Sequence, residues 1–536
     1  MKNKPYPLYS LPLITDLKDM VKQRAEEAPD AVAFSYMTSK NVMIQKTNKE
    51  FSDDIDAFGT YLYSKGFRNA HIAIIGRNSY EWVVAFLAAA NGGNVAVPID
   101  KNLSADKVEQ LMKQSDCCAA VTSRKCSELV AGLKDITHFC TKEMHDYIEE
   151  GRKLIDEGYT EFLDHSVCID KMAAIFFTSG TTGDSKGVML SHGNIASDVN
   201  AACKNFVLNG PTLAVLPFHH TFGLNTAVFK VFHYGFPVHI NRCLKQLQSD
   251  LKLIKPQTIF VVPLFLATFY KSVLTTAKKT GKDKTLRRAA KVSDVFLNVG
   301  IDMRSKLFQS VRSAFGGNLE FVICGGAALD EKYIKAFRSW GITILNGYGI
   351  TECSPVVSVN RNQYWRDGSV GQILQGIEVK IAEDDEILVK GDNVMLGYYK
   401  DEAATEAVLN DGWYSTGDLG RVDEDGFLYI TGRKKNLIIL SNGENVSPEE
   451  IESQILSDDA VAEAVVFENK GMLAVEIFPS EEFLGNQEYF DNMIKEYNKH
   501  QTQYKHLHKV RLRDEEFEKN STKKILRFKV NEQSHS

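Results

Sequence analysis

Apolar residues along the first two thirds of the chain follow two alternating patterns, one typical of helices and one typical of strands. Leu17, Met20, Val21 and Ala25 lie at helical spacing and predict an amphipathic helix over residues 16–27. Short apolar runs then alternate with helical segments. The predicted strands are 71–75, 94–98, 118–122, 172–177, 212–217, 258–262, 321–324 and 342–345, and the helices between them include 80–90, 105–114 and 193–205. This alternation predicts an α/β fold with parallel, doubly wound sheets.

The pattern changes from about residue 368. Residues 379–389 and 422–429 each place a polar turn between alternating apolar positions, which predicts two antiparallel hairpins at the side of the main sheets. Residues 433–436 form a charged break, after which Ser447-Pro448-Glu449-Glu450 predicts a helix start with a capping box. We therefore expect a large domain over residues 1–432 and a small α+β domain over residues 437–536.

Composition and charge narrow the class of protein. The chain has 536 residues, 44% of them hydrophobic and 25% charged, which is ordinary for a soluble globular protein. A net charge of −6 gives no general footprint for nucleic acid. Nine scattered cysteines without metal-ligand spacing indicate free thiols in a reducing compartment. The first residues lack the apolar core of a signal peptide, and the longest apolar stretch, 258–269, contains Pro263. We expect a cytoplasmic protein without a transmembrane segment.

Residues 278–288 form a basic stretch that stands out from this balance. Such a stretch could contact an anionic membrane surface or an acidic partner, so peripheral membrane contact stays open. We interpret it as a solvated helix face or loop, because most charge runs are of that kind.

A loop rich in glycine and hydroxyl residues lies between two apolar runs, 172–177 and 188–190. Glycines let the backbone curl and turn its N–H groups inward, and one lysine adds positive charge, so the loop suits a polyphosphate. It is not a Walker loop, because Ser185 stands where glycine would precede the lysine. The candidate phosphate-binding residues are Thr178, Ser179, Gly180, Thr181, Thr182, Gly183 and Lys186.

Three further segments also follow predicted strands, and ligands of parallel α/β sheets bind beyond the carboxyl ends of strands. They are 217–223, which contains His219 and His220; 325–328, which begins with Gly325, Gly326 and Ala327; and Asn346-Gly347-Tyr348-Gly349-Ile350-Thr351-Glu352. Beside a triphosphate, Glu352 is a natural Mg²⁺ ligand. Taken alone, Glu352 could equally be a carboxylate favoured by a helix N-terminus, and Asp418 reads as a turn residue.

In this order, followed by Asp418, Arg433 and a basic tail, the segments make the chain resemble the adenylate-forming superfamily. This superfamily includes acyl-CoA synthetases, luciferases and the adenylation domains of peptide synthetases. Its motifs match 178–187, Tyr348 to Glu352, Thr416 to Asp418 and the hinge at 432–435. The terminal motif matches 521–527, with Lys523 where glycine is usual, which places the family's catalytic lysine on Lys524. Residues 6–9 and the tail are most similar to bacterial medium- or long-chain acyl-CoA synthetases.

The resemblance implies a two-step ligase that uses ATP, Mg²⁺ and coenzyme A. A carboxylate attacks the α-phosphate of ATP, and a thiol then displaces AMP from the acyl adenylate. Lys524 and Mg²⁺ on Glu352 would stabilise the developing charge. Tyr348 would stack on adenine beside Gly325, Gly326 and Ala327, and Asp418 and Arg433 would bind the ribose. The remaining residues of the Tyr348 segment assigned to the nucleotide are Asn346, Gly347, Gly349 and Thr351.

The resemblance also implies a mobile C-terminal domain that turns about a hinge at residues 433–436, with Lys435 at the hinge position. In its second orientation Ser441, Asn442, Gly443 and Glu444 would approach the pantetheine thiol, and Lys524 would move away. His220 matches the histidine that orients the carboxylate or gates the thiol tunnel. An alternative interpretation of the His219-His220 pair is that the two side chains pack at the end of a strand.

The acid is predicted to be fatty or otherwise apolar, because no acidic residue lies between His219 and Tyr234 to hold an amino group. The acyl pocket is expected at Phe222, Gly223, Leu224, Val262 and Pro263. Two alternatives remain open at this point. One is an acyl-AMP ligase that loads the pantetheine of a separate acyl carrier protein, and the other is a nucleotide-binding protein without ligase chemistry.

Overall fold

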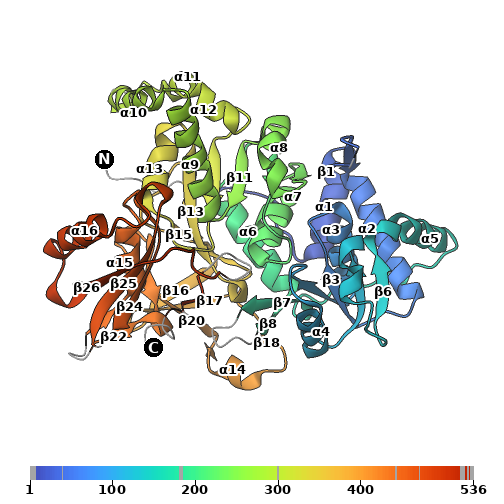
Figure 1. Cartoon of the computed structure of the whole chain (residues 1–536). Helices are drawn as coiled ribbons and strands as arrows, with labels where there is room; N and C mark the ends of the chain where they lie inside the picture. The colour runs from blue at the N-terminus through green and yellow to red at the C-terminus, as the bar shows by residue number, and fades with distance from the viewer. Residues whose placement is uncertain are drawn as a thin grey trace.

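The structure is a computed structural model that describes residues 8–38, 40–179, 185–298, 301–440, 444–469, 471–519, 525–527 and 530. Figure 1 shows a large part built from sheets and covering helices, coloured blue to orange, and a smaller C-terminal part coloured red. The described residues therefore confirm the predicted α/β class, with antiparallel strands beside the main sheets and an α+β C-terminal part.

The first large sheet holds the strands that flank the glycine-rich segment. Its order is β18-β8-β7-β4-β3-β5-β6, and the run from β7 to β6 is parallel. The strands are β3 (His71–Ile75), β4 (Val95–Ile99), β5 (Cys117–Thr122), β6 (Thr137–Cys140), β7 (Met172–Ser179), β8 (Ser185–Ser191) and β18 (Gly397–Tyr398). β7 and β8 pair antiparallel, so the glycine-rich segment joins two adjacent strands.

The second large sheet holds the strands that precede the other candidate segments. Its order is β15-β14-β13-β12-β11-β9-β10-β1-β2, and the run from β13 to β1 is parallel. The strands are β1 (Val32–Met37), β2 (Met43–Thr47), β9 (Thr212–Ala214), β10 (Val238–Ile240), β11 (Thr258–Val261), β12 (Phe321–Cys324), β13 (Thr343–Gly349), β14 (Val356–Val359) and β15 (Gln372–Ile373). The β1–β2 hairpin at its edge is an element that the sequence pattern did not indicate.

Smaller antiparallel sheets follow. β16 (Ile377–Ile381), β17 (Glu386–Gly391), β19 (Leu409–Asn410), β20 (Trp413–Val422) and β21 (Leu428–Arg433) form one sheet, and the predicted hairpins lie within it. The C-terminal part contains the pair β22 (Ile438–Ile439) and β23 (Asn445–Val446), and a sheet of β24 (Val461–Asn469), β25 (Met472–Pro479) and β26 (Leu507–Leu512).

Helices cover the sheets, and several begin where their capping residues predict. Ser79 accepts a hydrogen bond from the Trp82 amide and Ser104 from the Lys107 amide, so both predicted N-caps are confirmed. The helices are α1 (Leu17–Glu27), α2 (Asn48–Ser64), α3 (Tyr80–Asn91), α4 (Ala105–Gln114), α5 (Met144–Asp156), α6 (His192–Asn205), α7 (Lys230–His233), α8 (Leu247–Ile254), α9 (Pro263–Lys279), α10 (Asp283–Asn298), α11 (Arg304–Leu307), α12 (Gln309–Ala314), α13 (Glu331–Ser339), α14 (Glu402–Glu406), α15 (Pro448–Ile455) and α16 (Gln487–Lys499).

Two sequence predictions need correction. The capping box at Ser447 does not form: its hydroxyl donates to the Thr431 carbonyl oxygen and to Glu449, because β21 lies against the start of α15. The strand predicted over 212–217 ends at Ala214, and the chain then turns towards His219. The basic stretch forms the end of α9 and the start of α10, where Lys282, Lys284 and Arg288 are exposed, as expected for a solvated helix face.

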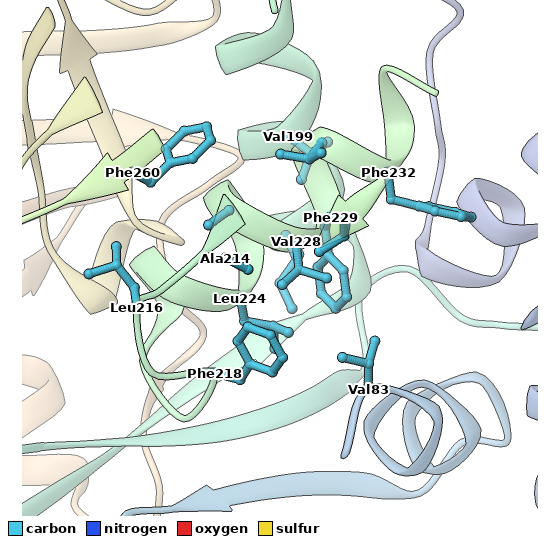
Figure 2. Close-up of a cluster of buried hydrophobic side chains, with 14 of the residues drawn as sticks. Val83, Val199, Ala214, Leu216, Phe218, Leu224, Val228, Phe229, Phe232 and Phe260 are labelled. Carbon is cyan, nitrogen blue, oxygen red and sulfur yellow. The ribbon is translucent and has the colours of Figure 1, made fainter. Parts of the chain in front are cut away.

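The core of the large part lies between the two main sheets. Figure 2 shows Val83 of α3 and Val199 of α6 near residues of the turn after β9 and of the π-helix that follows it, among them Phe218, Leu224 and Phe229. All of these side chains are buried, so the turn that carries the two histidines rests on a packed apolar base.

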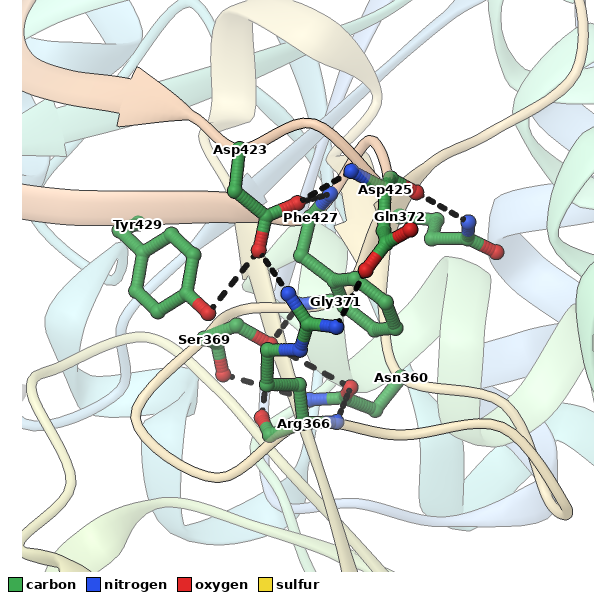
Figure 3. Close-up of polar contacts among 9 residues, drawn as sticks. All are labelled: Asn360, Arg366, Ser369, Gly371, Gln372, Asp423, Asp425, Phe427 and Tyr429. Atoms are coloured by element: carbon green, nitrogen blue, oxygen red, sulfur yellow. Dashed lines mark hydrogen bonds and ion pairs between the residues drawn. The ribbon is translucent and has the colours of Figure 1, made fainter. Parts of the chain in front are cut away.

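A polar network fixes the hairpin formed by β20 and β21. Figure 3 shows Arg366 reaching both carboxylates of its turn, Asp423 and Asp425, with a distance of 2.6 Å from Arg366 Nη2 to Asp425 Oδ2. Arg366 also stacks on the Phe427 ring at 4.7 Å, and the Tyr429 hydroxyl donates to Asp423 at 3.2 Å. The loop after β14 thereby holds the hairpin that carries Asp418 and Arg433.

Candidate active site

Several candidate segments meet at one edge of the second sheet. β11, β12 and β13 are adjacent and parallel, with Val261 opposite Cys324 and Cys324 opposite Asn346. Val262 and Gly325 therefore leave the sheet at the same edge, where β13 continues beside them through Gly347. This edge is where open α/β sheets bind ligands.

The Gly325-Gly326 turn lies in the middle of this edge. Gly326 has φ +84°, a conformation that favours glycine. A Cβ on Gly325 would lie 3.3 Å from the Gly347 carbonyl oxygen and 3.6 Å from Phe222, and one on Gly326 would lie 3.6 Å from Val262. The structure thus brings Phe222 and Val262, both assigned to the acyl pocket, to the turn assigned to the nucleotide.

Tyr348, Asp418 and Arg433 form a chain of polar contacts. The Tyr348 hydroxyl donates to Asp418 Oδ2 at 2.8 Å, and Arg433 Nε lies 2.7 Å from Asp418 Oδ1. Burial, followed by the Asp418 charge, raises the pKa of Tyr348 well above its ordinary value. Burial opposes the charge on Arg433, but the Asp418 carboxylate outweighs it and raises the pKa of Arg433. The tyrosine therefore remains a hydrogen-bond donor, and Arg433 remains charged at neutral pH.

Glu352 lies in the short 3₁₀ turn Thr351–Cys353 that follows β13. Its Oε1 accepts a hydrogen bond of 2.9 Å from the Tyr398 hydroxyl, and the Lys186 ammonium lies 4.6 Å from the centre of the Tyr398 ring. Tyr398 belongs to β18, which pairs with β8, the strand that carries Lys186. Tyr398 therefore connects the glycine-rich segment of the first sheet with Glu352 at the edge of the second.

Sequence reasoning missed Tyr398, because its neighbours Gly397 and Tyr399 give no local sign of a site. The pairing of β18 with β8 and a 2.8 Å hydrogen bond from the Met395 amide to the Glu352 carbonyl oxygen bring it to Glu352.

Part of the glycine-rich segment belongs to the two strands. Thr178 of β7 lies opposite Lys186 of β8, and Ser179 ends β7. Gly180, Thr181, Thr182 and Gly183 lie outside the described residues. The predicted phosphate loop thus connects the ends of a hairpin that places Lys186 near Tyr398 and Glu352.

The two histidines lie in contact, with ring centres 4.2 Å apart. His219 Nε2 is 3.7 Å from Asp100 Oδ2, at the end of β4. Burial, followed by the neighbouring His220, lowers the pKa of His219, so its imidazole is neutral at neutral pH. His220 is half-buried and begins the turn into a π-helix over Phe222–Phe229, a rare conformation that is frequent at functional sites.

The remaining acyl-pocket predictions differ in their surroundings. Leu224 is buried in the cluster of Figure 2, whereas Phe222 and Val262 are half-buried. A Cβ on Gly223 would overlap with the Pro217 carbonyl oxygen, so glycine lets this turn close. Gly223 is therefore a residue that the turn needs in order to close against Pro217.

The residues predicted for the hinge and for the thiol side come later in the sequence than the segments at this sheet edge. Lys435 is exposed in the turn Lys434–Asn436, and the preceding Lys434 is 2.7 Å from Glu386 Oε2. Glu444 is exposed, and its carbonyl oxygen accepts from the Leu440 amide at 3.0 Å. Ser441, Asn442, Gly443 and Lys524 lie outside the described residues.

A magnesium ion held by one carboxylate and by nucleotide phosphates fits Glu352, since a hard cation takes one or two carboxylates with phosphate oxygens. Within the described ranges, no cluster of three or more His, Cys, Asp or Glu residues forms a cage that would hold a metal by itself.

Comparison with known proteins defines the class. The profile of the AMP-binding enzyme family matches residues 21–399, and that of the AMP-binding enzyme C-terminal domain matches residues 435–535. The chain therefore belongs to the AMP-binding enzyme family.

Curated relatives within this family carry a consistent name. The chain is 29% identical over 475 residues to the long-chain-fatty-acid–CoA ligase FadD15 of Mycobacterium bovis, covering 83% of this chain and 79% of that protein. It is 30% identical over 458 residues to the long-chain-fatty-acid–CoA ligase 5 of Rattus norvegicus, covering 76% of this chain and 66% of that protein.

Solved structures share the fold. The anthranilate CoA ligase AuaEII in complex with anthranoyl-AMP superposes with a TM-score of 0.79 at 20% identity, covering 98% of both chains. The o-succinylbenzoate CoA synthetase of Bacillus subtilis with its acyl-adenylate intermediate gives a TM-score of 0.74 at 23% identity, covering 95% of this chain and 97% of that one.

None of the helices in the described part of the chain is both long enough and apolar enough to span a bilayer. All nine cysteines lie within the described residues and are free thiols, as the sequence predicted.

Proposed function

We propose that this AMP-binding enzyme is an ATP-dependent, AMP-forming ligase that joins a long-chain fatty acid to the thiol of coenzyme A. The observation that carries the proposal is the meeting of Glu352, the Gly325-Gly326 turn and the Asp418–Arg433 pair at one sheet edge. The names of the curated relatives support the fatty acid and coenzyme A as substrates.

In the first step a carboxylate oxygen of the acid attacks the α-phosphorus of ATP. The bond from the α-phosphorus to the bridging oxygen breaks, and pyrophosphate leaves. Two anions must approach each other, so the site needs positive charge that is fixed in advance. Lys186 and Lys524 would supply it from the protein.

Glu352 would hold Mg²⁺, which neutralises phosphate charge when bound. A solved o-succinylbenzoate CoA synthetase contains ATP and a magnesium ion, which supports these ligands for a protein of this fold. Thr178 to Lys186 would bind the β- and γ-phosphates, and Tyr348 would lie against adenine.

The polar chain from Tyr348 to Arg433 would bind the ribose. A carboxylate offers about four lone-pair positions, and Tyr348 and Arg433 occupy two of those on Asp418. The remaining positions suit the two ribose hydroxyls. The two existing contacts hold the carboxylate in a fixed orientation before the nucleotide arrives.

In the second step the sulfur of coenzyme A attacks the acyl carbon, the bond from that carbon to the AMP oxygen breaks, and the thiol proton goes to solvent. We infer that residues 437–536 turn about the hinge at 433–436 between the steps, with Lys435 absorbing the change. Ser441 to Glu444 would then face the pantetheine arm, and His220 would orient the carboxylate or gate the thiol.

The apolar surroundings of Phe222 and Val262 support a fatty acyl chain beside the Gly325-Gly326 turn. Neither side chain carries charge, and the turn of 217–223 holds no acidic residue to bind an amino group. The exposed cations at the start of α10 are compatible with peripheral contact at an anionic lipid surface.

The test is ATP–pyrophosphate exchange with acetate, octanoate, palmitate and benzoate, followed by addition of coenzyme A. We expect exchange that depends on the acid and is fastest with palmitate, and AMP release once coenzyme A is present. ATP binding without exchange would contradict ligase chemistry. AMP release only with an added carrier protein would identify the carrier-loading alternative.

The Lys524→Ala variant tests the catalytic assignment. We expect loss of adenylation, with most thioester formation from supplied palmitoyl-AMP retained, because the lysine acts only in the first step. Equal loss of both half-reactions would remove the proposed role.

A further inference from the structure

Three glutamates at the start of α15 each bind a different segment of the C-terminal part. Glu449 Oε1 accepts from Asn436 Nδ2 at 2.5 Å, which connects the helix to the hinge turn Lys434–Asn436. Glu450 accepts from the Lys505 ammonium at 2.7 Å, and Glu452 binds Arg527 in the tail. One helix turn thus joins the hinge, the segment before β26 and the tail.

The contact between Glu452 and Arg527 is the most buried of the three. Glu452 Oε1 accepts from Arg527 Nη1 at 2.8 Å and from the Val466 amide at 2.6 Å, and Oε2 accepts from Arg527 Nη2. The side chain of Glu452 is 8% exposed and that of Arg527 is 25% exposed. Two parallel hydrogen bonds fix the orientation of the guanidinium as well as its position.

Other contacts of the described tail hold it to the C-terminal sheet: Val530 is buried in the apolar cluster of β24 and β25, and Lys519 pairs with Glu463 of β24. The Leu526 amide donates to the Glu518 carbonyl oxygen at 2.9 Å, and Ile525 forms an isolated antiparallel β-bridge with Lys519. The Ile525 side chain packs on the apolar cluster of β24 and β25. These contacts fix the tail to its own residues 518 and 519 and to the C-terminal sheet. Arg527 is the side chain that ties it to α15, and through Glu449 to the hinge.

An open cavity borders the hinge side of this junction. A cavity of about 310 Å³ lies between the hinge and β24, lined among others by Lys435, Asn436 and Arg527. The hydrogen bond from Asn436 to Glu449 holds the hinge turn to α15, and Lys434 ties the same turn to Glu386.

We propose that Arg527 and Glu452 are positioning residues for adenylation: their paired hydrogen bonds fix the tail to the helix that also holds the hinge. Lys524 stands three residues before Arg527 in the sequence. Loss of the pair releases the tail from α15 and reduces the time that the lysine spends at the reacting carboxylate. The inference rests on the role proposed for Lys524.

The experiment measures both half-reactions on the full-length protein: ATP–pyrophosphate exchange with palmitate, and thioester formation from supplied palmitoyl-AMP and coenzyme A. For Arg527→Gln we expect kcat of exchange to fall at least 30-fold, with KM for ATP and palmitate within threefold. Thioester formation should also stay within threefold.

Arg527→Lys keeps the cation but loses the paired geometry, so we expect a smaller loss, about three- to tenfold, in exchange alone. This variant also decides the matter if Arg527→Gln does not fold. The matched control is Lys505→Gln, which removes the partner of Glu450 on the same helix and should change neither half-reaction more than twofold.

Equal losses in both half-reactions, or exchange within twofold of the unmodified protein, would overturn the inference. Lys524→Ala is measured in parallel. If it leaves adenylation intact, the proposed role of Lys524 fails and the inference with it. If Lys524→Ala abolishes exchange and folded Arg527→Gln does not slow it, only the inference fails.

Discussion

Tyr348 and Asp418 lie 70 positions apart in the chain, and the tyrosine hydroxyl donates a 2.8 Å hydrogen bond to the aspartate. This contact joins the end of β13 in the second large sheet to β20 in the antiparallel sheet. It places the aromatic ring proposed for adenine and the carboxylate proposed for ribose in a fixed relation. The proposed nucleoside site is thus formed by two sheets together.

The first prediction concerns this hydroxyl. Tyr348→Phe keeps the ring but removes the donor, so of the two described contacts of the Asp418 carboxylate the one to Arg433 remains. A hydrogen bond to a charged group contributes about 1.5–3 kcal/mol, so we expect KM for ATP to rise about tenfold. Tyr348→Ala, which also removes the ring, should raise it further. Steady-state kinetics measure both, and an unchanged KM in Tyr348→Phe would contradict the proposed orientation of Asp418.

The second prediction concerns Glu352 and Tyr398. Glu352→Gln removes the proposed magnesium ligand, and we expect pyrophosphate exchange to fall by about 10²–10³-fold. Tyr398→Phe leaves the carboxylate but frees its orientation, and should raise the Mg²⁺ concentration needed for half-maximal rate by several-fold. Tyr399→Phe is the control, because its hydroxyl donates instead to Asp116 at the surface. Exchange in Glu352→Gln at the original rate would remove Glu352 from the site.

The third prediction concerns the turn that carries the histidines. A Cβ on Gly223 would overlap with the Pro217 carbonyl oxygen, whereas a Cβ on Gly132 meets no atom within 4 Å. We expect Gly223→Ala to destabilise the protein by about 1–3 kcal/mol, as overpacking does, and to slow adenylation by displacing His220. Gly132→Ala should change neither property. Denaturant unfolding and exchange rates measure the pair, and equal behaviour of the two variants would show that the turn tolerates a side chain.

The fourth prediction concerns the fully buried Lys230 of α7. Its ammonium donates to the Ala202 carbonyl oxygen at 2.8 Å and lies over the Phe206 ring. Burial lowers the pKa of Lys230 from 10.5 to about 7, against the opposing effects of Cys203 and Asp198. Between these two values the unfolded chain holds a proton that the folded protein has released, so the free energy of unfolding rises with pH.

Replacing Lys230 by Met removes that rise. From pH 7.5 to 9.5 the unmodified protein should gain about 2–3 kcal/mol relative to Lys230→Met, since one pKa unit corresponds to about 1.36 kcal/mol. Denaturant unfolding at both pH values measures the difference. Lys204→Met, on α6 and only half-buried, should keep the rise. Parallel pH profiles for the protein and Lys230→Met would mean that Lys230 stays protonated in the folded state.

The local pattern of the sequence determined most of the elements, because helix caps and apolar runs depend on residues close along the chain. Ser79 and Ser104 begin helices as predicted, and the strands at 71–75 and 321–324 have the predicted bounds. Short motifs, among them residues 178–187, 348–352 and 416–418, also defined the resemblance to the family whose profile the chain matches.

Tertiary structure decided what these patterns could not contain. Ser447 begins a capping-box sequence, but β21 lies beside it, and the Ser447 hydroxyl donates to the Thr431 carbonyl oxygen instead of capping the helix. Tyr398 reaches Glu352 because β18 pairs with β8 and the Met395 amide bonds the Glu352 carbonyl oxygen, and Arg527 reaches Glu452 from 75 residues away. Such contacts depend on how distant segments pack together, and their energy is absent from any short stretch of chain. The sequence therefore specified the groups that the site uses, while packing between the sheets and around α15 set their geometry.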